Sequence, residues 1–170
     1  GAGVSQAIGT GGNDLSAEVG GISMLTGLDY LIDDRGTEVI VLISKPPAKA
    51  IAETILAKAR SSGKPVVVSF LGADPRASSG GNLHGVKTLD DAARAAVALS
   101  QGGVPKLGQE AVMLPAALPR FATGQESLRA LFSGGTFALQ ATMLLQETFD
   151  IHSNTTVGRS LPLHDPFRSE

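Results

Sequence analysis

Val39-Ile40-Val41-Leu42-Ile43 is the stretch that decides the fold of this chain. Consecutive apolar residues, most of them β-branched, predict a strand over residues 37 to 44 that is buried on both faces, as in a parallel sheet. Lys45-Pro46-Pro47 ends this strand, and a segment with apolar residues at helical spacing then runs to Ser62-Gly63. A second strand is expected over residues 66 to 71. This order predicts two parallel strands joined by a crossover helix.

The residues before this unit predict a further strand and helix. Val4 to Ile8 predicts a strand, and Gly9-Thr10-Gly11-Gly12 closes it. Ile22 to Leu31 repeats apolar residues at helical intervals and predicts a helix that ends at Arg35-Gly36. The alternation of strand and helix therefore starts near the first residue of the sequence.

The residues after residue 71 continue the same alternation. His84 to Lys87 predicts a short strand, and Thr88-Leu89-Asp90-Asp91 is a capping box that predicts an alanine-rich helix to about Ser100. Crossovers between parallel strands are right-handed. Residues 1–101 are therefore predicted to form an α/β domain with a flavodoxin-like, doubly wound parallel sheet.

The last seventy residues differ in character from the first hundred. Residues 102–127 contain prolines, glycines and scattered hydrophobic residues, and they predict a linker. A helix is expected from Thr136 to about residue 149, as the start of a second, similar unit over residues 128–170. After Asp150 no element longer than a short strand is expected. The chain is thus expected to be part of a larger assembly or of a longer protein.

Composition excludes several classes of function. The 170 residues carry a formal charge of −2 without a basic run, so nucleic-acid binding is not expected. The sequence has no cysteine, a membrane helix and a signal sequence are not expected, and a cytoplasmic location is the expectation. The spacing of the histidines and carboxylates indicates no metal site, and with one tyrosine and no tryptophan the chain offers no aromatic pocket for a flavin.

Ligands of open parallel sheets bind beyond the carboxyl ends of the strands, so the loops there are candidate sites. Gly11, Gly12 and Asn13 belong to a loop whose backbone amides would hold an anion or an acyl carbonyl, or would serve only as a tight strand exit. Lys45 places a cation just after the carboxyl end of a predicted strand. Its ammonium group is expected either to bind a carboxylate or phosphate of a substrate or to remain solvated. Arg76 is a weaker candidate for the same role.

Ser133-Gly134-Gly135-Thr136 precedes the expected helix from residue 136 and is the best anion site in the sequence. Free backbone amides, the positive end of the helix dipole and two hydroxyl groups meet there, although a structural N-cap uses the same residues. His164 beside Asp165 is a weaker candidate, because the carboxylate raises the basicity of the imidazole; the alternative is a surface turn. Without a P-loop or nucleophile elbow, no residue is assigned a catalytic role.

Several of these loops, in this order, resemble the FdrA family. Residues 3–12 are similar to the strand and loop that open the second domain of the succinyl-CoA synthetase α subunit, and residues 13–21 narrow the resemblance to FdrA proteins. Further matching segments are residues 44–47, 70–72, 88–93, 131–136, 157–159 and 162–166. The resemblance covers nearly the whole chain, and it adds Arg159 to the weaker site candidates.

The resemblance implies an α-type ligase domain, followed by the beginning of a β-type unit. It also implies membership of the acyl-CoA synthetase superfamily, a small anionic substrate, partner subunits in a homo- or hetero-oligomer, and coenzyme A as the candidate cofactor. The chain departs from succinyl-CoA synthetases at two loops. Arg76-Ala77-Ser78-Ser79-Gly80-Gly81 stands where the phosphohistidine loop is expected, and Lys45-Pro46-Pro47 stands where a glutamate loop is expected.

These departures remove the histidine that a phosphoryl relay needs and leave alternatives open. One is a subunit of an oxamate carbamoyltransferase in purine-ureide (allantoin) catabolism, to which the family has been tied. Lys45 suits that reaction, because carbamoyl phosphate and oxamate are both anions. Another alternative is a scaffold without catalytic activity that serves only assembly.

Overall fold

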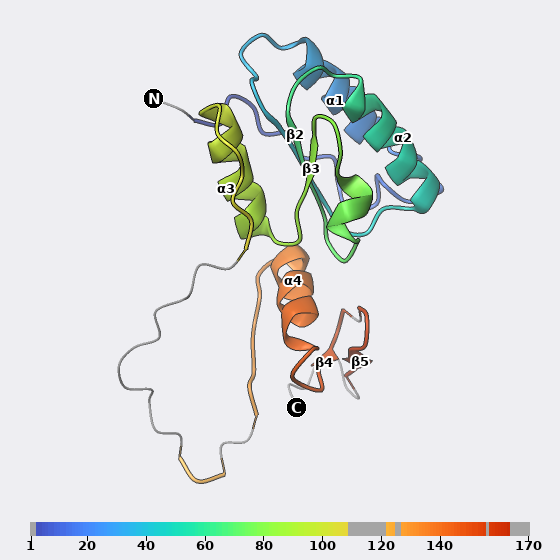
Figure 1. Ribbon diagram of the computed structural model, residues 1–170. Coiled ribbons are helices and arrows are strands. Elements are labelled where there is room, and N and C mark those ends of the chain that lie inside the picture. The colour runs from blue at the N-terminus through green and yellow to red at the C-terminus, as the bar shows by residue number, and fades with distance from the viewer. Residues whose placement is uncertain (1–2, 109–121, 125–126, 156, 164–170) are drawn as a thin grey trace. The chain divides into compact units, whose positions relative to one another are not determined.

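The computed structural model describes residues 3–108, 122–124, 127–155 and 157–163. The chain divides into two units, Gly1–Leu107 and Gly108–Glu170, which are described separately (Figure 1). The first unit contains a parallel sheet with helices and is a mixed α/β domain. The second unit contains a helix and a pair of very short strands in its described part.

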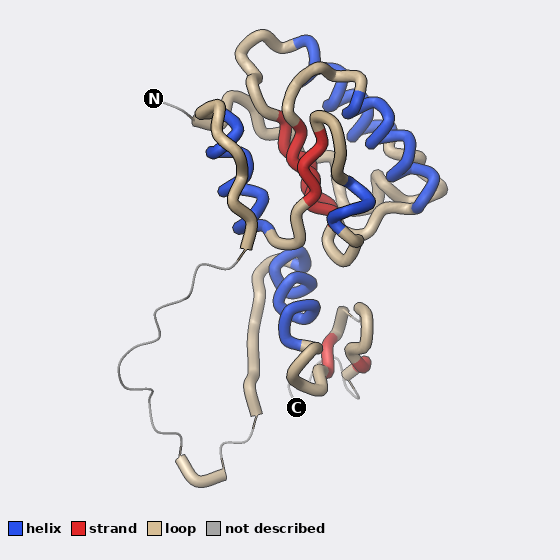
Figure 2. Tube along the Cα trace, viewed as in Figure 1, coloured by secondary structure: helices blue, strands red, loops and turns tan. Residues whose placement is uncertain are grey.

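Parallel strands form the sheet of the first unit, in the order β1 (Ile40–Ser44), β2 (Val66–Phe70) and β3 (Leu83–Gly85). Leu42 lies beside Val68, and Val68 lies beside Gly85. Figure 2 shows these strands next to one another between helices. The strand predictions from the two apolar runs are confirmed, and β3 begins one residue earlier than expected.

Helices cover both faces of this sheet. α1 (Ile22–Asp33) and α2 (Lys49–Arg60) pack on the face that carries Val66, Val68 and Phe70. α3 (Leu89–Ser100) packs on the opposite face, against Val67 (Figure 1). Side chains alternate between the two faces of a strand, so β2 supplies both cores, and all five of its residues are buried.

The helix boundaries follow from local sequence. Gly21 precedes α1 with φ 75°, a left-handed conformation that glycine adopts without the steric penalty of a β-carbon. Thr88 caps α3 because its Oγ1 accepts a hydrogen bond from the Asp91 amide at 3.0 Å, which confirms the predicted cap. After α1, Nζ of Lys64 donates to the carbonyls of Leu31 (2.8 Å) and Asp34 (2.6 Å), so a cation meets the negative end of the helix.

Asn82, just before β3, joins the segment after α2 to the sheet. Its Nδ2 donates to the carbonyl oxygens of Ala59 (3.0 Å) and Lys64 (2.7 Å) and to Oγ of Ser62 (3.3 Å). The link between β2 and β3 contains only a 3-10 turn, Pro75–Ser78, in place of a helix. Hydrogen bonds donated by the side chain of Asn82 therefore help to fix where β3 starts.

Two expectations about strands are wrong. Residues 4–8 do not form a strand, because the structure pairs them with no other strand. Val4 is 85% exposed there, and the loop with Gly11 and Gly12 therefore does not follow a strand. β1 is also not buried on both faces: Ile40 and Leu42 are buried, whereas Val41 and Ile43 are exposed. β1 is an edge strand, and α3 packs against Val39 at its start.

The described part of the second unit contains α4 (Gly135–Leu145), which ends four residues earlier than predicted. β4 (His152–Ser153) and β5 (Leu161–Pro162) then pair in parallel. The amides of Thr148 and Phe149 both bond the Leu145 carbonyl at 2.9 Å, so a turn replaces the last expected helical residues. The short strands agree with the expectation for the tail after Asp150.

Candidate functional site

The carboxyl end of β1 leads directly into the turn that carries Lys45. Lys45 is exposed and has no ion-pair partner in the described part of the chain. The Leu71 amide donates to the Ser44 carbonyl at 2.9 Å, so the residues after β1 and β2 begin at the same edge of the sheet. Lys45 therefore lies at the edge where parallel sheets bind ligands, with its charge available to an anion.

The glycine-rich loop approaches this turn from the amino-terminal side. The Ala48 amide at the start of α2 donates to the Leu15 carbonyl at 3.0 Å. Asn13, which precedes Leu15 by two residues, accepts a hydrogen bond from the Ser16 amide through its carbonyl at 3.0 Å. The structure thus brings the end of the predicted glycine loop to the turn that follows β1.

Asp14 is the residue in this loop that the sequence did not single out. It is 4% exposed, and its carboxylate accepts hydrogen bonds from the amides of Ser23 (2.9 Å) and Met24 (2.8 Å) in the first turn of α1. Asp14 precedes Ser23 by nine residues, whereas a capping residue normally lies two or three positions before the amide that it binds. No local spacing rule therefore identifies it.

The charge of Asp14 changes what the loop can bind. Burial raises the pKa of Asp14, but the hydrogen bonds from Ser23 and Met24 together outweigh burial and hold the pKa below its usual value. The carboxylate stays ionised at neutral pH and occupies the amino-terminal end of α1. An external anion cannot use the same amides, so α1 offers no anion site.

Gly11 and Gly12 are exposed in the loop that contains Asp14. Gly11 has φ 87°, and a β-carbon at either glycine would meet no atom within 4 Å. No packing therefore requires glycine at these positions, although the φ of Gly11 favours it. Both glycines belong to the loop that also carries the negative charge of Asp14.

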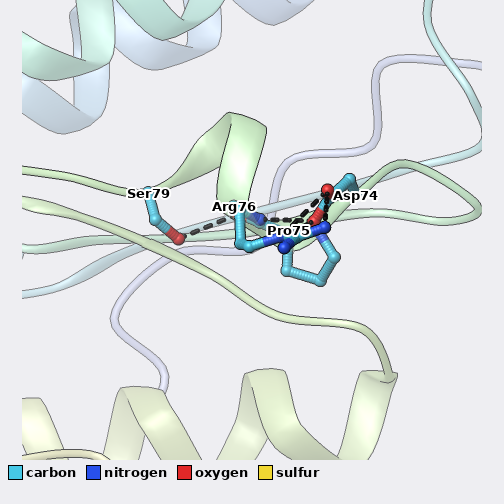
Figure 3. A network of polar contacts seen from close by, with 4 residues as sticks. All are labelled: Asp74, Pro75, Arg76 and Ser79. Atoms are coloured by element: carbon cyan, nitrogen blue, oxygen red, sulfur yellow. Dashed lines mark hydrogen bonds and ion pairs between the residues drawn. The ribbon is translucent and has the colours of Figure 1, made fainter.

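Arg76, the weaker candidate after β2, is engaged by its neighbour Asp74 (Figure 3). Its Nε lies 3.1 and 3.0 Å from the two carboxylate oxygens, and its Nη2 lies 2.8 Å from Oδ2. Hydrogen bonds from Arg76 lower the pKa of Asp74, and those to Asp74 raise the pKa of Arg76. An anion would have to compete with this carboxylate for the guanidinium.

The amino-terminal tip of α4 contains Ser133, Gly134, Gly135 and Thr136. Gly134 is the N-cap residue, with φ −140° and ψ 135°, and no side chain of the described residues caps the helix. Ser133, Gly134 and Gly135 are exposed and Thr136 is half-buried. Amides in the first turn of a helix have no intrahelical acceptor, so those at this tip remain available to an anion. This arrangement is the opposite of the one at α1.

Arg159 lies against the other end of α4. Its Nη2 donates to the Gln146 carbonyl, and its amide donates to Oε1 of Gln146 at 2.8 Å. Arg159 also lines a hollow of about 190 Å³ whose wall includes Glu147 and Asp150. The arginine thus binds the carboxyl end of α4, where a cation is favourable, beside two acidic residues. His164 and Asp165 lie outside the described residues.

The candidate anion-binding groups belong to different units of the chain. Gly11, Gly12, Asn13 and Lys45 are in the first unit, and the tip of α4 is in the second. Within the described residues, no group of three histidines or carboxylates is arranged to hold a metal ion. None of the described helices combines the length and the hydropathy that a membrane crossing requires.

No family model matches this chain. Uncharacterized protein YahF of Escherichia coli (strain K12) is 38% identical to it over 173 aligned residues. The alignment covers 99% of this chain and 34% of YahF, so the chain spans about a third of the length of that relative. Nearly every residue of this chain therefore has a counterpart in one segment of a longer protein.

Proposed function

We propose that the chain is an FdrA-type member of the acyl-CoA synthetase superfamily, with a flavodoxin-like first domain, that binds a small anionic acyl or carboxylate substrate. The observation that carries the proposal is the uncapped tip of α4, where Gly134 and Gly135 leave backbone amides open between the hydroxyl-bearing residues Ser133 and Thr136. Coenzyme A, whose phosphates are also anions, is the proposed cofactor.

The proposed chemistry omits a phosphohistidine relay. In the described residues the loop after β2 carries Asp74 and Arg76 rather than a histidine, and His84 lies within β3 instead of beyond the end of a strand. His152 lies in β4, with its Nδ1 3.4 Å from the Pro162 carbonyl oxygen. A histidine that transfers a phosphoryl group needs access to both substrates, and neither location favours this role.

Lys45 supports a second candidate function, that of a subunit of an oxamate carbamoyltransferase. The lysine is exposed at the ligand-binding edge of the sheet and has no ion-pair partner in the part of the chain that is described. A cation in this place would bind either oxamate or carbamoyl phosphate. Calorimetric titration with CoA, succinate, oxamate and carbamoyl phosphate separates these candidate functions. If none of the four ligands gives a heat of binding, the remaining candidate is an assembly scaffold without catalytic activity.

Substituting Gly134 tests the tip of α4 directly. We expect Gly134→Asp to weaken the affinity for the anion at least tenfold, about 1.4 kcal/mol, because the new carboxylate caps the amides and repels the ligand. A β-carbon at Gly134 meets no atom within 4 Å, so the substitution fits the fold. The measurement is calorimetric titration with the ligand that binds the unmodified chain.

Gly134→Ser is the matched control, because it adds a capping hydroxyl without a charge. The serine variant should lose less affinity than the aspartate variant, and both should melt at or slightly above the temperature of the unmodified chain. Equal affinities for all three proteins would remove the tip of α4 from the proposed site.

Substituting Lys45 tests the other candidate group independently. We expect Lys45→Ala to weaken oxamate or carbamoyl phosphate binding about fivefold, roughly the 1 kcal/mol of an exposed charge pair, and the loss should shrink as salt is added. Lys45→Arg keeps the charge and should stay within about twofold. Unchanged affinity in Lys45→Ala would exclude the lysine from the site and would favour the tip of α4 alone.

A further inference from the structure

A small hollow lies in the second unit at the carboxyl end of α4, opposite the tip that contains Gly134 and Gly135. Its volume is about 190 Å³, and its wall includes residues 146–151, Arg159 and Leu161. Cavities of about 150 Å³ hold a benzene molecule, so this hollow suits a ligand of about six to eight non-hydrogen atoms. It is too small to enclose CoA.

Arg159 is fixed in this wall by the C-cap residue of α4, Gln146. The Arg159 amide donates to Oε1 of Gln146 at 2.8 Å, and Nη2 of Arg159 donates to the Gln146 carbonyl. Gly158 permits this close approach, because it has φ 59° and a β-carbon there would lie 2.5 Å from Oε1 of Gln146. A guanidinium has further N–H donors besides the one that Gln146 binds, and they are available to a ligand.

The wall of the hollow carries charges of both signs. Arg159 contributes a guanidinium, and Glu147 and Asp150 contribute carboxylates. Neither Arg159 nor Asp150 takes part in an ion pair among the residues that the structure describes. The guanidinium and the Asp150 carboxylate therefore do not neutralise each other by direct contact, and each is suited to a ligand group of opposite charge.

Apolar side chains complete the wall. Phe149 and Leu161 are each 51% exposed, and Ile151 is half-buried. An apolar group of a ligand would cover part of this exposed surface and gain the usual free energy of burial. A ligand that matches the whole wall has a carboxylate, an ammonium group and a small apolar group.

We propose that this hollow is a binding site for a small apolar α-amino acid, in the size range from alanine to valine. The carboxylate of the amino acid accepts hydrogen bonds from the guanidinium of Arg159, and its ammonium group faces Asp150. Compounds with negative charge alone are disfavoured by Glu147 and Asp150, and simple amines are disfavoured by Arg159. The site is separate from the one in the proposed function and does not depend on it.

The experiment is a titration of the complete 170-residue chain at pH 7, followed by the NMR signals of its backbone amides. The ligands are L-alanine, lactate, which lacks the ammonium group, and L-alaninamide, which lacks the carboxylate. L-Alanine should shift the signals of residues 146–151 and 159–161. It should bind at least about fivefold more tightly than either analogue, because each analogue loses one charged contact.

Asp150→Asn tests the ammonium contact with little change in shape. It should weaken L-alanine binding at least about threefold and should narrow the preference for L-alanine over lactate. Arg159→Lys keeps the charge but loses the planar fork of donors, so it should weaken L-alanine and lactate alike. Asp33→Asn is the control, because Asp33 is an exposed aspartate in the first unit and should leave both affinities unchanged.

Circular dichroism confirms that each variant is folded. Asp150 makes no ion pair in the described part of the chain, so its substitution remains informative even if Arg159→Lys disturbs the end of α4. The proposal is overturned if L-alanine at about 50 mM shifts none of the signals of residues 146–151 and 159–161. Lactate binding as tight as that of L-alanine overturns it too, as does an unchanged preference in Asp150→Asn.

Discussion

Gly85→Ala should destabilise the first unit by about 3 kcal/mol, at the upper end of what an overpacked site costs. The alanine β-carbon would enter the space of the Pro75 carbonyl, lying 2.9 Å from its carbon, and would lie 2.8 Å from Oγ of Ser79. Both distances are shorter than β-carbons tolerate. Because the obstacle includes backbone, no side-chain rotation relieves the clash.

The neighbourhood of Gly85 has little freedom to move. Oγ of Ser79 donates to the Pro75 carbonyl at 2.8 Å (Figure 3). The same oxygen accepts from the Gly85 amide at 3.1 Å, which holds the 3-10 turn against β3. Gly85 also pairs with Val68 in the sheet. An added methyl group must therefore separate the turn from β3 or displace β3 from β2.

Urea denaturation followed by circular dichroism measures this effect. Gly12→Ala is the matched control, because a β-carbon at Gly12 meets no atom within 4 Å and its φ is not in the left-handed region. The control should stay within about 0.5 kcal/mol of the unmodified chain. A Gly85→Ala variant that is equally stable would show that the turn and β3 are not packed as described.

Asp14→Ala should cost about 2 kcal/mol, because it leaves the amides of Ser23 and Met24 without their acceptor. It also removes a negative charge from the amino-terminal end of α1, where the helix dipole favours one. Asp33→Ala serves as the control, since Asp33 is an exposed carboxylate at the other end of the same helix. Urea denaturation at pH 7 compares the two variants.

The same carboxylate should make stability depend on pH. Burial raises the pKa of Asp14, and the hydrogen bonds from Ser23 and Met24 lower it further than burial raises it, so the folded-state pKa lies below the usual 3.8. Such a group contributes its full stabilisation above the unfolded-state pKa, and the contribution is lost as the pH falls through the folded-state value. Asp14→Ala should therefore lower stability less at pH 2 than at pH 7.

Acid titration of both proteins tests this expectation. The difference in free energy of unfolding between the unmodified chain and Asp14→Ala should be constant above about pH 5 and should narrow below about pH 4. A difference that stays constant down to pH 2 would contradict the assignment of the ionised carboxylate as the cap of α1.

The elements of the first unit were largely predictable because their signals are local. The apolar run around Ile40 and Leu42, the helical spacing from Ile22 and the capping box at Thr88 each identify an element that the structure contains. These patterns work because a strand buried along its length in a parallel sheet, as β2 is, is apolar throughout, and because a packed helix is apolar on one side. The predicted strand at residues 4–8 was wrong for a related reason. β-branched residues indicate a strand from local sequence alone, whether or not the fold provides a neighbouring strand to pair with it.

The candidate site was less predictable than the fold. Glycine clusters identified both the loop around Gly11 and the tip of α4 as candidate anion sites. Local sequence gave no reason to expect that only one of these two sites has free helix amides. The structure separates them through Asp14, whose carboxylate caps α1, whereas α4 has no side-chain cap among the residues that the structure describes. Hydrogen bonds between residues distant in sequence depend on how the loop folds, and spacing rules do not encode them.

The sequence by itself determined the order of strands and helices from Ile22 to Ser100, because periodicity and capping act between neighbouring residues. Tertiary structure alone decided which face of β1 is covered and which helix start is open to an anion. Burial of a face of β1 depends on where α3 packs against the sheet. The amides at a helix start stay open to an anion only if no carboxylate from a distant part of the sequence binds them. Both outcomes are properties of packing between segments far apart in the chain.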